Sequence, residues 1–166
     1  MRLRWETITA PGVHMDGVGL RAATRDDREF CFRLHKDAMG AYVDAVWGWD
    51  DQEQWAYHVE LFDPGRWRII TVDGADAGML SVDHHEDHIY LGRIELLPEH
   101  QGRGIGTYLI TELLSEAEQR GVDLVLDVLT VNRRAHALYR RLGLHDEHHP
   151  SDTKIRMRYR PGGPGT

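Results

Sequence analysis

The spacing of hydrophobic positions along the chain predicts alternating strands and helices. Residues 18–23 read as a first strand, and Thr24 with Asp27 has the pattern of a cap for the helix that follows. We expect this helix to bury one stripe of apolar side chains. The stripe consists of Phe30, Leu34, Ala38, Ala41 and Ala45.

A second helix is expected after the break at residues 47–49. Asp50 is a suitable N-cap because its carboxylate can accept a backbone N–H of the first turn. The predicted buried face of this helix consists of Trp55, Val59 and Phe62.

The rest of the chain continues the alternation. Asp73-Gly74 predicts a tight turn between two antiparallel strands, and the polar stretch at 83–87 predicts a loop. The order β-α-α-β-β-β-α-β-α-β indicates one α+β domain. The further elements are strands at 67–72, 77–82, 88–97 and 122–129, helices at 107–120 and 133–141, and a half-exposed strand around 155–159.

The segment from Gln101 to Gly106 carries three glycines between a predicted strand and a predicted helix. Glycine lets a ligand approach the backbone closely, and a helix start offers free N–H groups, so this segment is suited to bind a diphosphate. Its spacing departs from the G-x-G-x-x-G of dinucleotide sites, and it lacks the lysine of a P-loop. It fits the pattern Q-x-x-G-x-G.

A second motif follows the predicted strand at 122–129. Together with the glycine segment, it resembles the two signatures of the GNAT (GCN5-related) N-acetyltransferases, the second of which reads N-x-x-A-x-x-x-Y-x-x-x-G-(F/L). The resemblance covers residues 18–159. The positions of the second motif are Asn132, Ala135, Leu138, Tyr139 and Gly143.

The resemblance implies a fold and a co-substrate. The expected fold is α+β, a mixed and mostly antiparallel sheet of six to seven strands with about four flanking helices, whose splayed central strands form an acyl-CoA cleft. The implied co-substrate is acetyl-CoA, with Leu96 and Leu97 acting through main-chain groups, one N–H polarising the acetyl oxygen. The implied cofactor-binding residues are Leu96, Leu97, Gln101, Gly102, Arg103, Gly104, Ile105, Gly106, Thr107, Asn132 and Tyr139.

The resemblance also assigns a catalytic role to Tyr139. Family members commonly use a tyrosine here to protonate the departing CoA thiolate, and a phenol with a pKa near ~10 is protonated at neutral pH. The alternative is a core tyrosine on an amphipathic helix. For Asn132, an N-cap and a cofactor contact are compatible roles.

The general base is expected on the strand before the glycine segment. Glu95 stands between two apolar residues, where a carboxylate is out of place in a simple core and could accept the amine proton through water. The alternatives are a solvated Glu95, or one paired with Arg93 or a strand neighbour. Tyr90 and His88 compete for the same role.

The acceptor side is expected between the first two helices, which border it in the family. The segment at 44–55 is rich in tryptophan and carboxylates, and both favour a cationic group. The substrate-binding candidates are Trp47, Trp49 and Asp51. The alternative is that these aromatic residues are structural and the acids solvated.

Composition limits the classes of function. A chain of 166 residues with 41% hydrophobic content forms one compact domain, and its net charge of −7 argues against nucleic-acid binding. No apolar run is long enough to span a bilayer, so no membrane partner is expected. The single cysteine, Cys31, fits a buried inert thiol in a reducing cytoplasm. The positive charges near the second motif, which would favour an anionic cofactor, are Arg133, Arg134, Arg140 and Arg141.

Eleven histidines raise the question of a metal site. The two clusters, at 84–88 and 145–149, lack the helical i, i+4 spacing of hydrolase sites and have no cysteine for a structural zinc. We therefore expect two polar loops and no metal.

The sequence thus predicts a cytoplasmic, acetyl-CoA-dependent N-acetyltransferase that acetylates a primary amine of a small molecule or peptide by direct attack in a ternary complex. The alternatives are a non-catalytic acyl-CoA-binding or regulatory module and a histidine-mediated metal protein. The oligomeric state, a homodimer included, is open. The expected organisation is an N-terminal extension at 1–17 (strand or mobile arm), an acetyltransferase domain at 18–160 and a flexible tail at 161–166.

Overall fold

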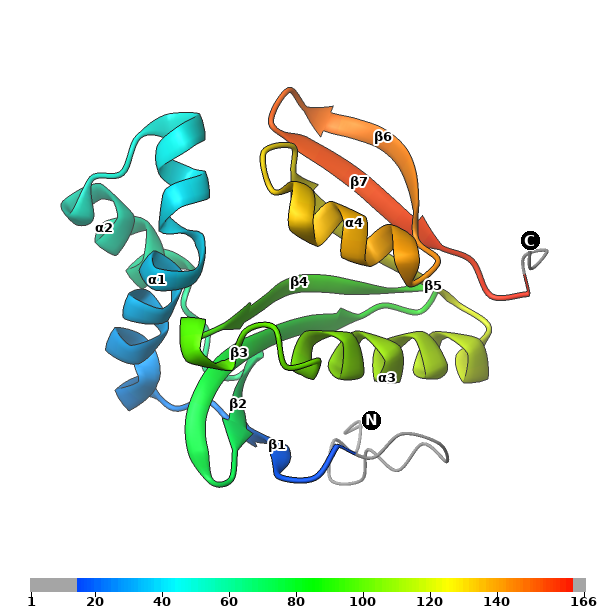
Figure 1. Cartoon of the computed structure of the whole chain (residues 1–166), viewed down its shortest axis with the longest axis horizontal. Coiled ribbons are helices and arrows are strands. Elements are labelled where there is room, and N and C mark those ends of the chain that lie inside the picture. The colour runs from blue at the N-terminus through cyan, green and yellow to red at the C-terminus, as the bar shows by residue number, and fades with distance from the viewer. Residues whose placement is uncertain (1–14, 163–166) are drawn as a thin grey trace.

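The computed structural model describes residues 15–162 and has a mixed seven-stranded sheet with helices on both faces (Figure 1). The expectations for the N-terminal extension and the tail lie mostly outside these residues. The strands are β1 (Val18–Ala22), β2 (Trp67–Val72), β3 (Ala75–His84), β4 (His88–Leu96), β5 (Asp123–Leu129), β6 (His145–Ser151) and β7 (Lys154–Tyr159). The helices are η1 (Arg25–Asp27), α1 (Arg28–Trp47), α2 (Asp51–Leu61), η2 (Pro98–His100), α3 (Ile105–Arg120) and α4 (Arg133–Arg141).

The sheet is split at its centre. Its order is β1-β2-β3-β4-β5-β7-β6, and every neighbouring pair is antiparallel except β4 and β5. These two parallel strands pair only from His88 with Asp123 to Leu91 with Leu126. Beyond Leu91 they diverge, while β4 stays paired with β3 and β5 with β7. The expected α+β fold with splayed central strands is confirmed.

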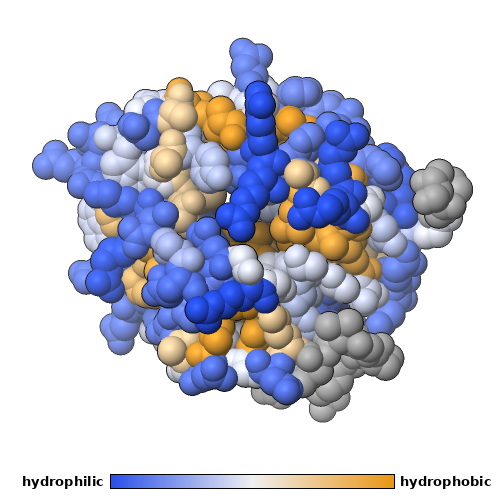
Figure 2. All heavy atoms as spheres, in the orientation of Figure 1, coloured by the Kyte–Doolittle hydropathy of each residue, from blue (hydrophilic) through white to orange (hydrophobic). Residues whose placement is uncertain are grey.

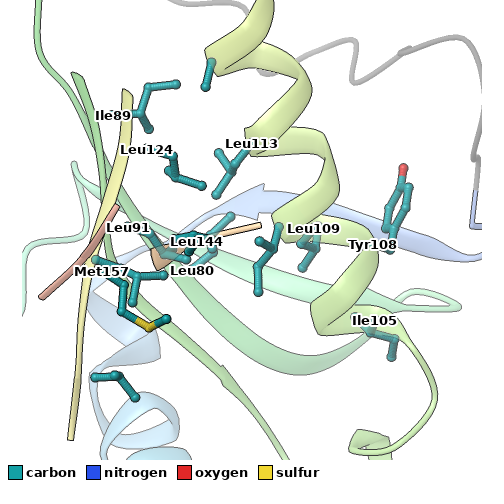
Figure 3. Packing of buried hydrophobic residues seen from close by; sticks show 14 of the residues in the cluster. Leu80, Ile89, Leu91, Ile105, Tyr108, Leu109, Leu113, Leu124, Leu144 and Met157 are labelled. Carbon is teal, nitrogen blue, oxygen red and sulfur yellow. The ribbon is translucent and has the colours of Figure 1, made fainter. Parts of the chain in front are cut away.

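Alternation along the central strands builds a core on each face of the sheet. Ile70 and Leu80 join a larger cluster with α3 and α4, whereas their neighbours Ile69 and Met79 join a smaller cluster with α1. Figure 3 shows the larger cluster, in which one side of α3 packs onto the strands. None of the described helices is both long enough and apolar enough to cross a membrane.

A β-bulge at Gly92 changes the face that the end of β4 presents. The pairing of β4 with β3 skips Gly92, so Leu91 before it and Ile94 after it both contribute to the larger cluster. With strict alternation, Leu91 and Glu95 would share a face. Because of the bulge, Glu95 instead turns toward α1.

The first helix buries a different stripe from the one its sequence predicts. Leu34 is buried as expected, but Ala41 and Ala45 are exposed, and Cys31 and Val43 are buried. Alanine contributes little apolar area, so an alanine-rich stripe is a weak guide to the buried face. The predicted stripe is therefore wrong in the second half of α1.

The second helix also departs from its predicted buried face. Val59 is 38% exposed, whereas the adjacent His58 is 3% exposed. His58 can be buried because its Nε2 donates to the carbonyl oxygen of Arg28, at 2.8 Å. The predicted cap is confirmed, since Asp50 accepts the N–H of Glu53 at 2.9 Å.

Two loop predictions need correction. The histidine-rich segment at 145–149 belongs to β6, an edge strand that pairs with β7 and whose residues are all exposed. With both faces in solvent, such a strand has no hydrophobic alternation to reveal it. The loop at 83–87 is shorter than expected because β3 continues to His84.

Candidate active site

A cleft of about 380 Å³ lies where β4 and β5 diverge. Residues of α1 line it on one side, and the glycine segment, α3 and α4 line it on the other. Figure 2 shows apolar atoms in a recess on this face, between hydrophilic side chains. The predicted cofactor residues that line the cleft are Leu96, Gln101, Gly102, Gly104, Ile105, Gly106, Thr107, Asn132 and Tyr139.

The glycine segment has the backbone of an anion-binding loop. Gly102 and Gly104 have φ angles of +72° and +83°, in the left-handed region that glycine adopts without strain. Gly104 is the N-cap of α3, so the first-turn N–H groups have no acceptor within the helix. The Gln101 amide donates to the carbonyl oxygen of Leu96 at 3.0 Å, which ties the segment to the end of β4.

Positive charge stands beside this loop. Arg134 and Arg141 of α4 both line the cleft. The Arg134 guanidinium approaches Gly102 closely, since a Cβ built on Gly102 would lie 3.7 Å from its Nη2. Helix dipole, free N–H groups and guanidinium groups therefore all favour an anion at the mouth of the cleft.

Two predicted cofactor residues do not line the cleft. Arg103 is exposed outside it. The N–H of Leu97 donates to the carbonyl oxygen of Ala77 at 2.8 Å, and its side chain packs in the smaller cluster. The N–H of Leu97 is therefore already used by β3, and the expected main-chain contacts of Leu96 and Leu97 with the donor stay a prediction.

Tyr139 lines the cleft from α4. Burial, and to a lesser degree the negative charge of Glu95, raises the pKa of its phenol to about 12. Its hydroxyl has no hydrogen-bond partner within residues 15–162. The side chain is also packed against the larger cluster, so a structural role and a chemical role are compatible. Asn132 caps the same helix by accepting the N–H of Ala135 at 3.2 Å.

Glu95 lines the cleft from β4 and is 7% exposed. Its Oε1 accepts a hydrogen bond from Nδ1 of His35, at 2.7 Å, while its Oε2 is buried without a partner among the described residues. The alternative pairing with Arg93 is not observed, since that guanidinium lies 5.2 Å from the Trp67 ring centroid. The partner of Glu95 is therefore His35, which the sequence analysis did not single out.

The two competing bases lie outside the cleft. The Tyr90 hydroxyl donates to Asp127 at 3.0 Å, and burial raises its pKa to about 12. Nδ1 of His88 lies 2.7 Å from the Asp87 carboxylate. Neither side chain borders the space that contains Tyr139.

The predicted acceptor residues stand near the cleft but do not line it. Asp51 accepts hydrogen bonds from the Trp49 indole and from Lys36, both at 2.7 Å. Trp47 is 57% exposed. The Trp49 ring centroid lies 6.0 Å from that of His35, so Trp49 neighbours the histidine that is hydrogen-bonded to Glu95.

The α1 wall of the cleft consists of residues that the sequence analysis missed as functional. They are Ala38, Met39 and Tyr42. Ala38 and Tyr42 continue the i, i+4 row of the buried Leu34, so the predicted core stripe runs into the cleft wall. An apolar stripe alone could not show that this face borders a cleft.

No group of three or more metal-ligating side chains is placed to hold an ion in the part of the chain from 15 to 162. The expectation that the native protein uses no metal stays a prediction. Cys31 is fully buried, as expected, and burial raises its pKa to about 12.

Comparison with known proteins shows that several acetyltransferases share this fold. Solved structures with a similar fold include the PaiA N-acetyltransferase of Thermoplasma acidophilum in complex with coenzyme A (TM-score 0.69, 14% identity, 86% of this chain and 98% of that chain). Another is the ribosomal-protein-S18-alanine N-acetyltransferase of Escherichia coli (TM-score 0.61, 22% identity, 89% and 96%). A third is Naa50 of Arabidopsis thaliana in complex with the bisubstrate analogue CoA-Ac-MVNAL (TM-score 0.58, 14% identity, 86% and 98%).

At these identities the likeness concerns the fold. No curated protein matches the chain by sequence. The sequence model of the acetyltransferase (GNAT) family, however, matches residues 23–144, well over half of the chain. The chain therefore belongs to the acetyltransferase (GNAT) family.

Proposed function

We propose that this acetyltransferase is an N-acetyltransferase, which transfers the acetyl group of acetyl-CoA to a primary amine of a small molecule or peptide by direct attack in a ternary complex. The observation that carries the proposal is that one cleft joins an anion-binding loop, a protonated phenol and a buried carboxylate. The loop is the segment from Gln101 to Gly106, the phenol is Tyr139 and the carboxylate is Glu95.

The residues on the α3 side fit the donor. When bound, acetyl-CoA supplies the thioester whose acetyl carbon reacts. The glycine segment would hold its diphosphate through backbone N–H groups, with Arg134 and Arg141 near the negative charge. The family resemblance assigns main-chain groups of Leu96 and the side chain of Asn132 to the rest of the donor.

The two titratable groups in the cleft would divide the proton transfers. Tyr139 holds a proton at its hydroxyl throughout the neutral range, because its pKa is raised, and can give it to the leaving sulfur. Glu95 can take the amine proton at Oε2, the oxygen that has no protein partner. Two groups with different environments in one site are typical of acid–base catalysis.

The α1 side would receive the amine. The similar structure of Naa50 holds the bisubstrate analogue CoA-Ac-MVNAL, which supports an amine acceptor. In this chain the α1 wall consists of Ala38, Met39 and Tyr42, which favours an amine that carries an apolar group. Trp47, Trp49 and Asp51 remain candidates for contacts beyond that wall.

The test is an acceptor screen with acetyl-CoA and a panel of amines. The panel contains an alkylamine, an arylalkylamine, a polyamine, an aminoglycoside, an amino acid and a peptide with a free N-terminus. We expect at least one amine to give free CoA and an equal amount of acetylated product by mass spectrometry. Tight acetyl-CoA binding without any acetylated amine would contradict the proposal and favour a non-catalytic acyl-CoA-binding module.

A further inference from the structure

We propose that His35 of α1 is the positioning residue of the acetyl transfer, which holds Glu95 so that Oε2 meets the amine. This inference rests on the proposed function. Nδ1 of His35 lies 2.7 Å from Oε1 of Glu95. Because an ionised carboxylate has no proton to donate, the ring donates this hydrogen bond from Nδ1. No other side chain within residues 15–162 donates to Glu95.

The fold brings these two residues together by means of the bulge at Gly92. If Gly92 were paired in strict alternation, Glu95 would face the larger cluster together with Leu91, and α1 could not reach it. Bulges next to active sites commonly re-aim a side chain in this way. The bond therefore joins the splayed end of β4 to a helix that lies 60 residues earlier in the chain.

The two oxygens of Glu95 have different surroundings. Oε1 is fixed by His35, while Oε2 is buried and unpartnered. A buried carboxylate oxygen without a partner is costly and uncommon, and it calls for an explanation. A substrate amine, or a water that relays its proton, would provide the missing partner.

The other polar groups around the pair do not take the place of His35. Arg93 of β4 stacks on Trp67. His58 of α2 is bonded to a backbone carbonyl. Tyr139 faces Glu95 from α4 and feels its charge, without a hydrogen bond to it. His35 alone therefore sets the orientation of the carboxylate.

The pair would act in one balanced step. Glu95 takes a proton from the amine nitrogen as that nitrogen forms its bond to the acetyl carbon. Tyr139 gives a proton to the sulfur as the carbon–sulfur bond breaks. The proton on Glu95 and the missing proton of Tyr139 are exchanged with solvent before the next turnover. His35 keeps its proton on Nδ1 throughout and contributes geometry.

The kinetic test compares two substitutions of His35. His35→Phe keeps a ring but removes the donor, whereas the amide nitrogen of His35→Asn stands close to the position of Nδ1 and can still donate. With acetyl-CoA and the amine of highest kcat/KM in the panel, we expect kcat to fall roughly 10- to 100-fold in His35→Phe, the range that a misplaced catalytic group costs. His35→Asn should recover most of this loss, and acetyl-CoA affinity should be unchanged in both.

A matched control is His85→Phe, because His85 is an exposed histidine outside the cleft. Thermal unfolding of all variants checks that α1 remains folded. Equal kcat in wild type and His35→Phe, or equal losses in His35→Phe and His35→Asn, would overturn the inference.

A double-mutant cycle tests whether His35 acts through Glu95. Once Glu95→Gln has removed the base, adding His35→Phe should cost no further activity, whereas independent effects would multiply. Nitrogen NMR of the imidazole gives a readout that needs no acceptor: His35 should carry its proton on Nδ1 in wild type, and an Nε2–H ring would contradict the inference. If wild type acetylates no amine, the proposed function fails. If wild type is active and the cycle is additive, only the role of His35 fails.

Discussion

At the scale of single residues, the cleft brings together a phenol and a carboxylate whose surroundings differ. Tyr139 is packed among apolar side chains, which stabilises the neutral phenol. Glu95 is 7% exposed and accepts a hydrogen bond from an imidazole. A proton donor and a proton acceptor can therefore coexist in one small space at the same pH.

Removal of the Tyr139 hydroxyl tests the acid. Tyr139→Phe keeps the ring that packs on the core, so folding and acetyl-CoA affinity should survive. General acid catalysis is worth about 10²–10⁴-fold, and kcat should fall by a comparable factor in steady-state assays. An unchanged kcat, with the chemical step shown to limit the rate, would assign the proton to another group or to water.

The raised pKa of Tyr139 also predicts a pH dependence. An acid works only while protonated, and a pKa of about 12 extends the protonated range above that of an exposed tyrosine, whose pKa is near ~10. We therefore expect kcat to show no decline from pH 7 to about pH 10. A decline with a midpoint below ~10 that disappears in Tyr139→Phe would contradict this assignment.

At the scale of elements, two local departures from regular structure build the site. The bulge in β4 aims Glu95 at α1, and left-handed glycines let the chain turn from η2 into α3 with the first turn of α3 at the cleft. Both departures were visible in the sequence only as glycines. Gly92 read as an ordinary strand residue, whereas the segment from Gln101 to Gly106 could be interpreted because its spacing matched a known pattern.

The glycine segment can be tested with a matched pair of substitutions. Gly104 and Gly121 cap the two ends of α3, both with positive φ, and neither has a backbone atom close to an added Cβ. Asparagine tolerates this conformation, so Gly104→Asn and Gly121→Asn should cost similar, small stability. Only Gly104 lines the cleft, so only Gly104→Asn should weaken acetyl-CoA binding. We expect calorimetry to show a loss of affinity of at least tenfold, which corresponds to about 1.4 kcal/mol.

Affinity equal to that of wild type in both variants would show that the donor phosphate does not bind at this loop. Equal losses in both would show that helix stability, rather than contact with the ligand, controls binding.

The start of α1 carries a testable contribution to stability. Arg21 donates two hydrogen bonds to Asp27, and the Thr24 N–H donates a third, which together lower the pKa of the carboxyl group. A lowered pKa stabilises the fold above the unfolded pKa of about 3.9, and the contribution is lost as the pH falls through the lower, folded value. Because Arg21 is partly exposed, we expect Asp27→Asn to cost about 1–2 kcal/mol at pH 7.

Urea unfolding checks this expectation, with Asp26→Asn as the control at an exposed neighbour. The difference between Asp27→Asn and wild type should shrink as the pH is lowered toward 3. A cost that is the same at both pH values would mean that the ionised carboxylate is not what stabilises this corner.

At the scale of the whole molecule, the sequence predicted most of the fold because its signals were local and strong. The strands around Ile69 and Met79 are short apolar runs on either side of the Asp73-Gly74 turn, and the motif ending at Gly143 located the last helix. It failed where the signal was weak or not local. The edge strand β6 has no buried face, and the partner of Glu95 stands 60 residues away on a helix face that no pattern marks.

The same division holds for the site. The donor side could be predicted because glycines and a helix start impose a spacing that can be recognised in one segment. The α1 wall with Ala38, Met39 and Tyr42 could not, because it becomes a wall only when α1 packs beside the split sheet. Tertiary contacts alone create this wall, which we propose to be the acceptor side.

Direct acetyl transfer in this cleft is tested most directly by a single-turnover experiment. The protein, in excess over acetyl-CoA, is mixed with acetyl-CoA and the amine of highest kcat/KM in the panel. The masses of the products and of the intact protein are followed over time by mass spectrometry. Direct transfer predicts that acetylated amine and free CoA appear together in equal amounts. The protein mass should not change, and acetyl-CoA without amine should stay intact. A transient acetylated protein, or complete absence of acetylated amine with bound acetyl-CoA, would contradict direct transfer in this cleft.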